Sequence, residues 1–322
     1  MAKEIPVKPI EGLKTTTPTP ISKDIEEYIS TLGDGKREII GIKTGIRELD
    51  RALLGLSGVI VLGGKAGGGK TNLALHLAKQ VAKNKTPVLF YSLEMAYIQI
   101  VTRLLSSLSK VGYGDILLKG NTVDKEGGKY QLPEEDKLKL MEGLGQLAEL
   151  GEYIHIKTTD TERSGEITFE TLKADVEYLK KKFKTEEVLV VVDHMQLFKP
   201  EGEYRDQIDK EQNLINNFKN TSTKTNATIL LISQQNKAGY DSDSVTSIKG
   251  SVEIIYLADV VMFIKANKDD IGNGEYAETF KEVGSDTREL EIVKNRYNAP
   301  RRGEYALKYS MEAQYSLIEF EE

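Results

Sequence analysis

One glycine-rich octapeptide restricts the fold of this 322-residue chain more than any other feature. Residues 64–71 read GKAGGGKT, which fits the pattern G-x-x-x-x-G-K-[S/T]. The apolar run VIVLG (59–63) precedes the motif, and TNLALHLAKQVAK (71–83), with the spacing of an amphipathic helix, follows it. A strand, this loop and a helix form a phosphate-binding site, because glycines let backbone N–H groups face phosphate oxygens at the positive end of the helix. The alternative is a tight strand–helix turn that binds nothing.

The residues of this motif have separate expected roles. Lys70 is expected to reach the β- and γ-phosphates of a nucleotide, and the Thr71 hydroxyl is expected to bind Mg²⁺. ATP and Mg²⁺ are therefore the predicted cofactors. The predicted cofactor-binding residues of this segment are Gly64, Lys65, Ala66, Gly67, Gly68, Gly69, Lys70, Thr71 and Asn72.

Strands and helices alternate along the rest of the chain. Buried strands are predicted at 59–63, 87–92, 188–193, 227–233 and 260–265. Amphipathic helices are predicted around 71–83, 97–110, 169–184 and 206–224. This alternation predicts an α/β fold with a mostly parallel sheet that helices cover on both faces. The closely spaced segments RELEIVK, EYALKYS and YSLIEF near the C-terminus predict an antiparallel β appendage.

Three polar residues follow predicted strands at their carboxyl ends, where α/β sheets bind ligands. Asp193 ends the run VLVVV and is expected to supply a carboxylate on the magnesium side. Glu94 follows PVLFYSL and is positioned to activate a water for attack on a γ-phosphate, and Gln234 is positioned to contact phosphate or water. The alternatives are an Asp193 that only ends a strand and a Glu94 that caps the helix beginning near Ala96.

The N-terminal region differs from the rest of the chain. Residues 1–21 hold four of the eight prolines and are predicted to form a flexible tail, with a short partner-docking peptide as the alternative. Within 22–36, the apolar residues Ile25, Tyr28, Ile29 and Leu32 are spaced as on one face of a helix, and that face needs a partner. Residues 37–322 are predicted to be the main domain.

Composition excludes several classes of function. The chain has no Cys and only three scattered His, which excludes a disulfide framework, a thiol nucleophile and Cys-type metal sites. No run approaches the ~20 apolar residues of a membrane helix, and no signal-peptide core is visible, so we expect a cytoplasmic protein. The formal net charge of −6 gives no general attraction to nucleic acid, so such binding would need a local basic surface.

Seven segments, in order, resemble the RecA-like ATPase domain of DnaB-type replicative helicases, over roughly residues 40–310. They are GIKTGIRELDRALLGL (41–56), GGKAGGGKTNLALHLA (63–78), FYSLEM (90–95), VVVDHMQLF (190–198), ISQQNK (232–237), KGSVEIIYLADVVMFI (249–264) and EIVKNRYNAPRRGEYALKY (291–309). The resemblance implies a RecA-like P-loop NTPase core and makes residues 37–322 an ATPase motor domain. It also implies that helix 22–36 is a linker helix that docks on a neighbouring subunit.

The resemblance also implies roles for single residues. Glu94 is the implied catalytic base, Asp193 the magnesium-side acid, and Gln234 the γ-phosphate sensor. Arg103 matches an arginine of the nucleotide site. Lys294 and Arg296 match a basic pair that such rings insert into the neighbouring subunit's nucleotide site.

Three departures from the family pattern stand out. We expect no N-terminal collar domain, which in this family recruits primase, because only the proline-bearing tail precedes the linker helix. His194 stands where a tyrosine is usual, and we expect a neutral packing change. Ile248 and Lys249 replace an Arg-Glu pair, which leaves the details of DNA contact open.

The expected DNA contacts lie in two loops, 198–210 and 236–250, that follow the strands of Asp193 and Gln234. The candidate DNA-binding residues are Lys199, Arg205, Lys237, Lys249 and Gly250. From the residues alone, these charges read as solvated loop charges. In a homohexamer, the resemblance places them in a central channel, where several copies would build a local positive field.

The predicted function is an ATP-dependent, ring-forming helicase that translocates on single-stranded DNA, with a primase or a loader as further partners. The alternative is a RecA-fold, DNA-dependent ATPase switch or remodeller that does not unwind. A strand-exchange recombinase is disfavoured, because SLEM and the closing KNR segment resemble helicases.

Overall fold

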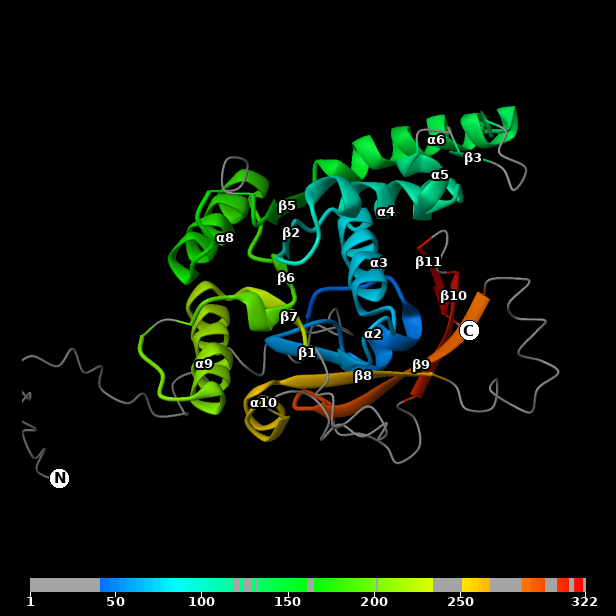
Figure 1. The fold of residues 1–322 in the computed structure, drawn as a ribbon. Helices are drawn as coiled ribbons and strands as arrows, with labels where there is room; N and C mark the ends of the chain where they lie inside the picture. The colour runs from blue at the N-terminus through cyan, green and yellow to red at the C-terminus, as the bar shows by residue number, and fades with distance from the viewer. Residues whose placement is uncertain are drawn as a thin grey trace, which may run out of the picture. The chain divides into compact units, whose positions relative to one another are not determined.

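A nine-stranded sheet forms the centre of the described part of the chain in the computed structural model (Figure 1). The described residues are 41–118, 122–123, 129–130, 132–160, 165–200, 202–233, 251–266, 285–298, 306–312 and 316–320. The predicted tail (1–21) and linker helix (22–36) lie outside these ranges. All described residues belong to the second of the two units into which the chain divides, Ile39–Glu322.

The strands follow the spatial order β11-β10-β9-β8-β1-β7-β6-β2-β5. The parallel strands are β1 (Val59–Gly64), β2 (Val88–Ser92), β5 (Ile154–Thr158), β6 (Leu189–Asp193), β7 (Thr228–Ile232) and β8 (Val260–Ala266). The antiparallel strands are β9 (Ser285–Asn295), β10 (Ala306–Glu312) and β11 (Leu317–Phe320). The five predicted parallel strands and the antiparallel C-terminal strands are confirmed. The latter continue the main sheet, because β9 pairs directly with β8.

Strand β5 is an element that the sequence did not predict. Its residues, IHIKT, include a histidine and a lysine, and only its first and last residues are buried. It lies at the edge of the sheet beside β2, so it needs no continuous apolar run. A further pair, β3 (Thr122–Val123) and β4 (Lys129–Tyr130), forms a separate two-stranded sheet.

Helices cover both faces of the sheet. The helices are α2 (Arg47–Leu53), α3 (Lys70–Lys83), α4 (Tyr97–Ser109), α5 (Tyr113–Leu117), α6 (Glu134–Gly151), α8 (Phe169–Phe183), α9 (Gln207–Thr225) and α10 (Ser251–Leu257), with a short 3₁₀ turn, η2 (Met195–Leu197). Successive side chains of β1 lie on opposite faces of the sheet. Ile60 and Leu62 belong to the buried cluster formed with α2, α3, α4 and α6. Val59 and Val61 belong to the cluster formed with α8, α9 and α10. Across the described ranges, no helix combines the length and apolar character that crossing a bilayer requires.

A compact turn leads the chain into β1. Asp50 of α2 is buried, and its carboxylate accepts hydrogen bonds from the Thr44 backbone N–H and hydroxyl and from the Gly45 N–H. Backbone bonds also pair Ile42 with Leu56. These contacts fix the start of β1, and therefore the position of the glycine-rich loop at its other end.

Candidate active site

The glycine-rich loop joins β1 to the first turn of α3, as predicted. Gly67 and Gly69 have φ angles of +72° and +87°, in the left-handed region that favours glycine. A Cβ on Gly69 would also stand 2.5 Å from the sulfur of Met311 on β10. The positive φ therefore favours glycine at position 69, and a larger residue there would also displace the end of the Met311 side chain.

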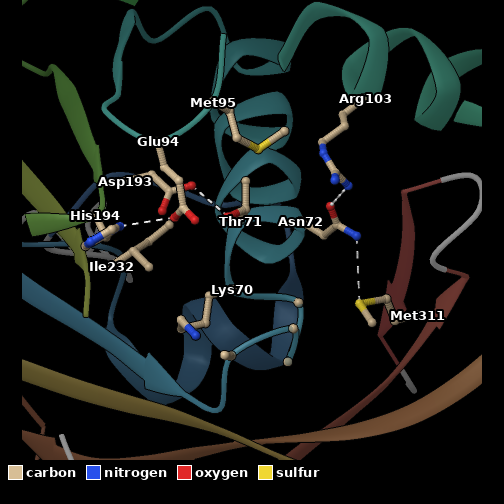
Figure 2. A pocket seen from close by; sticks show the side chains of 14 residues that line it. Lys70, Thr71, Asn72, Glu94, Met95, Arg103, Asp193, His194, Ile232 and Met311 are labelled. Carbon is tan, nitrogen blue, oxygen red and sulfur yellow. Dashed lines mark hydrogen bonds and ion pairs between the residues drawn. The ribbon is translucent and has the colours of Figure 1, made fainter. Parts of the chain in front are cut away.

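A pocket of about 420 Å³ opens beside this loop (Figure 2). Residues 66–72 line it on one side, and Glu94, Arg103, Asp193 and His194 line much of the remainder. These side chains come from segments far apart in the sequence, and they meet because β1, β6 and β2 end at the same edge of the sheet. Gly64 and Lys65, also predicted to bind the cofactor, do not line the pocket.

Lys70 is held inside the loop. Its Nζ donates to the backbone carbonyls of Gly64, at 2.8 Å, and Lys65, at 2.7 Å. Its side chain is buried, and burial lowers the pKa of the amine, against the opposing effect of Asp193 and Glu94. The contacts with these carbonyls hold the amine beside the N-terminus of α3. In a nucleotide complex, phosphate oxygens would replace the two carbonyls as its partners.

Thr71 and Asp193 form the oxygen-rich side of the pocket. The Thr71 hydroxyl donates to Asp193 Oδ2 at 2.6 Å, and Asp193 is 3% exposed. Burial raises the pKa of the Asp193 carboxyl, and the hydrogen bond from Thr71 opposes that rise. A hydroxyl and a carboxylate are oxygen ligands of the kind that Mg²⁺ takes in proteins. These two residues therefore fit the predicted magnesium site.

Glu94 lies beside this pair. The Leu93 N–H donates to the Asp193 carbonyl at 2.7 Å, which brings the residues after β2 next to the residues after β6. The Ala96 N–H at the start of α4 donates to the side chain of Gln99, so Gln99 and not Glu94 caps this backbone donor at the N-terminus of the helix. The Glu94 side chain is 57% exposed and reaches the pocket.

His194 contacts Glu94, which the sequence analysis missed. The distance from His194 Nδ1 to Glu94 Oε2 is 3.1 Å. One carboxylate oxygen of Glu94, one of Asp193 and one ring nitrogen of His194 all lie within 4.8 Å of one another. The expectation of a neutral packing change overlooked that a residue directly after Asp193 faces the end of β2. The adjacency of β2 and β6 brings the two side chains together, and no local sequence pattern signals it.

Arg103, which the resemblance matches to an arginine of the nucleotide site, lines the wall of the same pocket. Its Nη1 donates to Asn72 Oδ1 at 3.0 Å and approaches the Ser316 hydroxyl at 3.5 Å. The guanidinium carbon stands 4.8 Å from the centre of the Tyr113 ring. Asn72 and Arg103 therefore form one polar wall between α3 and α4 (Figure 2).

Lys294 and Arg296 lie away from the pocket of their own chain. Lys294 Nζ donates to the carbonyls of Ile255, Tyr256 and Ala258, each at 2.8 Å, at the end of α10. Arg296 Nη1 donates to Asp259 Oδ1 at 2.8 Å. Asp259 directly precedes β8, so both cations lie at the end of the parallel strands opposite the glycine-rich loop.

The predicted DNA contacts are described only in part. Lys199 and Arg205 are exposed in the segment between β6 and α9, and Arg205 approaches Asp209 at 3.5 Å. Gln234, Lys237, Lys249 and Gly250 lie outside the described residues.

The loop, the buried aspartate at the end of β6 and the sheet order define a P-loop nucleoside triphosphatase with a RecA-like α/β fold. Sequence comparison then gives the family. The family model described as "DnaB-like helicase C terminal domain" matches residues 41–316, and the chain belongs to this family.

Curated relatives agree with this assignment. The chain is 29% identical to "Replicative DNA helicase DnaC" of Bacillus subtilis over 246 residues, which are 74% of this chain and 50% of that protein. It is 25% identical to "Replicative DNA helicase DnaB" of Rickettsia typhi over 274 residues, 79% of this chain and 51% of that protein. The chain thus spans about half the length of the curated relatives it matches.

Solved structures share the fold. One of them, described as an ATPase domain, superposes with a TM-score of 0.77 at 18% identity, covering 95% of this chain and all of that one. "The Structure Of A DnaB-Like Replicative Helicase And Its Interactions With Primase" gives a TM-score of 0.76 at 17% identity, covering 93% of this chain and 68% of that one.

Proposed function

We propose that the protein is an ATP-driven, ring-forming motor that translocates on single-stranded DNA and separates duplex strands. One observation carries the proposal: Lys70, Thr71, Glu94 and Asp193 line a single pocket at the strand ends. This set supplies the phosphate-binding cation, the oxygen ligands and the base that ATP hydrolysis needs. Membership of the DnaB-like helicase family supports the proposal that ATP hydrolysis drives movement on DNA.

The pocket suggests how hydrolysis proceeds. Backbone N–H groups of the loop and Lys70 bind the β- and γ-phosphates. Thr71 and Asp193 would hold Mg²⁺, and the bound ion would neutralise charge on the phosphates. Glu94 takes a proton from the water that attacks the γ-phosphorus, and the products are ADP and phosphate.

The position of the C-terminal cations supports the proposed ring. Strand β1 has six residues, so its two ends stand about 17 Å apart at ~3.3 Å per residue. Arg296 lies near one end and the loop follows the other, so this arginine is too far to serve its own pocket. A neighbouring copy of the chain is the partner whose pocket it would complete, and a closed hexamer gives every pocket such a neighbour.

Single-stranded DNA is the proposed track, with Lys199 and Arg205 among its contacts. Both are exposed in the segment that follows β6, the strand that ends at Asp193. A movement of Asp193 on ATP hydrolysis could therefore be transmitted to them along a short stretch of chain. One solved neighbour is a DnaB-like replicative helicase described together with its interactions with primase, and a primase is therefore a proposed partner here. A loader is a further proposed partner, on the family resemblance alone. The second candidate function remains an ATPase switch that binds DNA without unwinding it.

A strand-displacement assay on a forked DNA duplex tests the proposal. The full chain with ATP and Mg²⁺ should release the displaced strand, whereas the Lys70→Ala protein and a non-hydrolysable ATP analogue should not. DNA-stimulated hydrolysis without displacement would instead support the switch. Absence of both hydrolysis and displacement from a folded, oligomeric protein would overturn the proposal.

A further inference from the structure

The ends of β2 and β6 bring His194 against Glu94. Ser92 and Asp193 are register partners, and the Leu93 N–H donates to the Asp193 carbonyl at 2.7 Å. The next residues outward, Glu94 and His194, therefore leave the sheet side by side (Figure 2). The His194 side chain is 10% exposed, whereas that of Glu94 is 57% exposed. A fixed imidazole thus stands beside a carboxylate that is otherwise open to solvent.

A carboxylate at this position needs a donor to hold it. The Asp193 carboxylate lies within 4.8 Å and carries charge of the same sign, so it repels Glu94. Lys70 directs its amine to the carbonyls of Gly64 and Lys65, and Arg103 is bonded to Asn72. Among the described residues, His194 is the side chain that donates to Glu94.

The contact leaves the two Glu94 oxygens in different environments. A carboxylate oxygen only accepts hydrogen bonds, so the hydrogen in the 3.1 Å contact belongs to His194 Nδ1, and Oε2 accepts it. Within the described part of the chain, Oε1 accepts no side-chain hydrogen bond and remains available to a water. A general base works only when its reacting oxygen lies within hydrogen-bond reach of that water.

We propose that His194 is a positioning residue for hydrolysis: it fixes Glu94 through Oε2 so that Oε1 faces the attacking water. The inference rests on the proposed role of Glu94 as the base. In this role His194 acts through Glu94 and makes no contact of its own with the reacting atoms. Its effect is therefore expected on the chemical step and not on ATP binding.

Two nearly isosteric variants of the full chain separate hydrogen bonding from packing. In His194→Asn, the amide Nδ2 can take the place of imidazole Nδ1, whereas His194→Leu fills a similar volume without a donor. The single-turnover ATP hydrolysis rate of His194→Leu should fall about tenfold, because a misplaced base loses reactive geometry. His194→Asn should stay within about threefold of the parent, and both should bind a fluorescent ATP analogue within about twofold of the parent.

A double-mutant comparison with Glu94→Gln completes the test. If His194 acts through Glu94, adding His194→Leu to Glu94→Gln should slow the residual hydrolysis no further. Parental hydrolysis by His194→Leu, or equal losses in the Leu and Asn variants, would overturn the inference. If His194→Leu does not fold, His194→Phe replaces it in the comparison. Failure of both to fold while His194→Asn folds would assign a structural role and also overturn the inference.

The outcomes distinguish this inference from the proposed function. Near-normal hydrolysis by Glu94→Gln removes Glu94 from the base role, and the proposed mechanism fails with it. An inactive Glu94→Gln protein together with a fully active His194→Leu protein overturns only the role of His194.

Discussion

Arg296 is bound to Asp259 within its own subunit, by its side chain and its backbone. Nη1 donates to Oδ1 at 2.8 Å, and the Arg296 N–H donates to the Asp259 carbonyl at 2.9 Å. Asp259 is 1% exposed and also accepts from Lys219 Nζ and the Val59 N–H. The aspartate therefore ties the arginine to the start of β1, the strand that carries the glycine-rich loop at its other end.

The first prediction concerns this buried carboxylate. Asp259→Asn should lower the free energy of unfolding by about 3 kcal/mol, because the buried partner of two cations loses its charge. Urea denaturation of the variant and the parent measures the difference. Glu135→Gln is the control: that carboxylate is exposed and pairs with Lys139, so its replacement should leave the unfolding midpoint close to that of the parent. A loss at Asp259 no larger than in the control would contradict a structural role for the cluster.

The second prediction concerns nucleotide handling. Lys70→Ala should weaken ATP binding and abolish turnover, because the loop loses its lysine contact to the β- and γ-phosphates. Glu94→Gln should keep the ATP affinity and lose about a hundredfold or more of the hydrolysis rate, since the amide cannot accept the proton. Equilibrium binding of a fluorescent ATP analogue and single-turnover hydrolysis measure the two quantities separately. Equal affinity losses in both variants would contradict the division of roles.

The third prediction concerns Lys79, a buried amine on α3. Its Nζ donates to the Ser107 hydroxyl at 3.1 Å, and burial, assisted by Lys83, lowers the pKa of the amine to about 8. The unfolded chain binds this proton more tightly, so the stability of the folded state should rise as the pH increases from about 8 to 10.5. Below that window, keeping the cation buried costs of the order of 3 kcal/mol.

Lys79→Met should therefore stabilise the protein at pH 7 and remove most of the rise in stability above pH 8. Urea denaturation at pH 7, 8, 9 and 10 provides the measurement. Lys181→Met, on the exposed face of α8, is the matched control and should leave the pH dependence unchanged. The same pH dependence in Lys79→Met as in the parent would show that another group causes it.

The sequence predicted the elements that have strong local signals. Interior strands such as β6 are buried on both faces and read as continuous apolar runs, and the loop motif fixes Lys70 and Thr71 by spacing alone. The edge strand β5 gave no such run. The pairing of His194 with Glu94 and that of Arg296 with Asp259 join residues 100 and 37 positions apart. Both pairs depend on which strands are neighbours, and a local pattern does not contain that information.

The last prediction tests whether Arg296 acts on a neighbouring subunit. Arg296→Ala subunits should bind ATP but hydrolyse it poorly, because an arginine near the γ-phosphate stabilises the charge of the transition state. Glu94→Gln subunits should also be inactive, yet they keep Arg296. In mixed rings, some interfaces will join an intact Glu94 to an intact Arg296 of the neighbour. ATPase activity should therefore return on mixing, with its maximum at intermediate ratios.

Native mass spectrometry shows whether hybrid rings have formed, and the ATPase rate is then measured across the mixing ratios. Hybrid rings with no more activity than either variant alone would contradict a simple action between subunits. Strict coordination around the ring would give the same result, because one inactive site would then silence the rest. Titrating Glu94→Gln into the parent protein separates the two explanations. Strict coordination predicts a loss of activity steeper than the fraction of variant added, whereas independent sites predict a proportional loss.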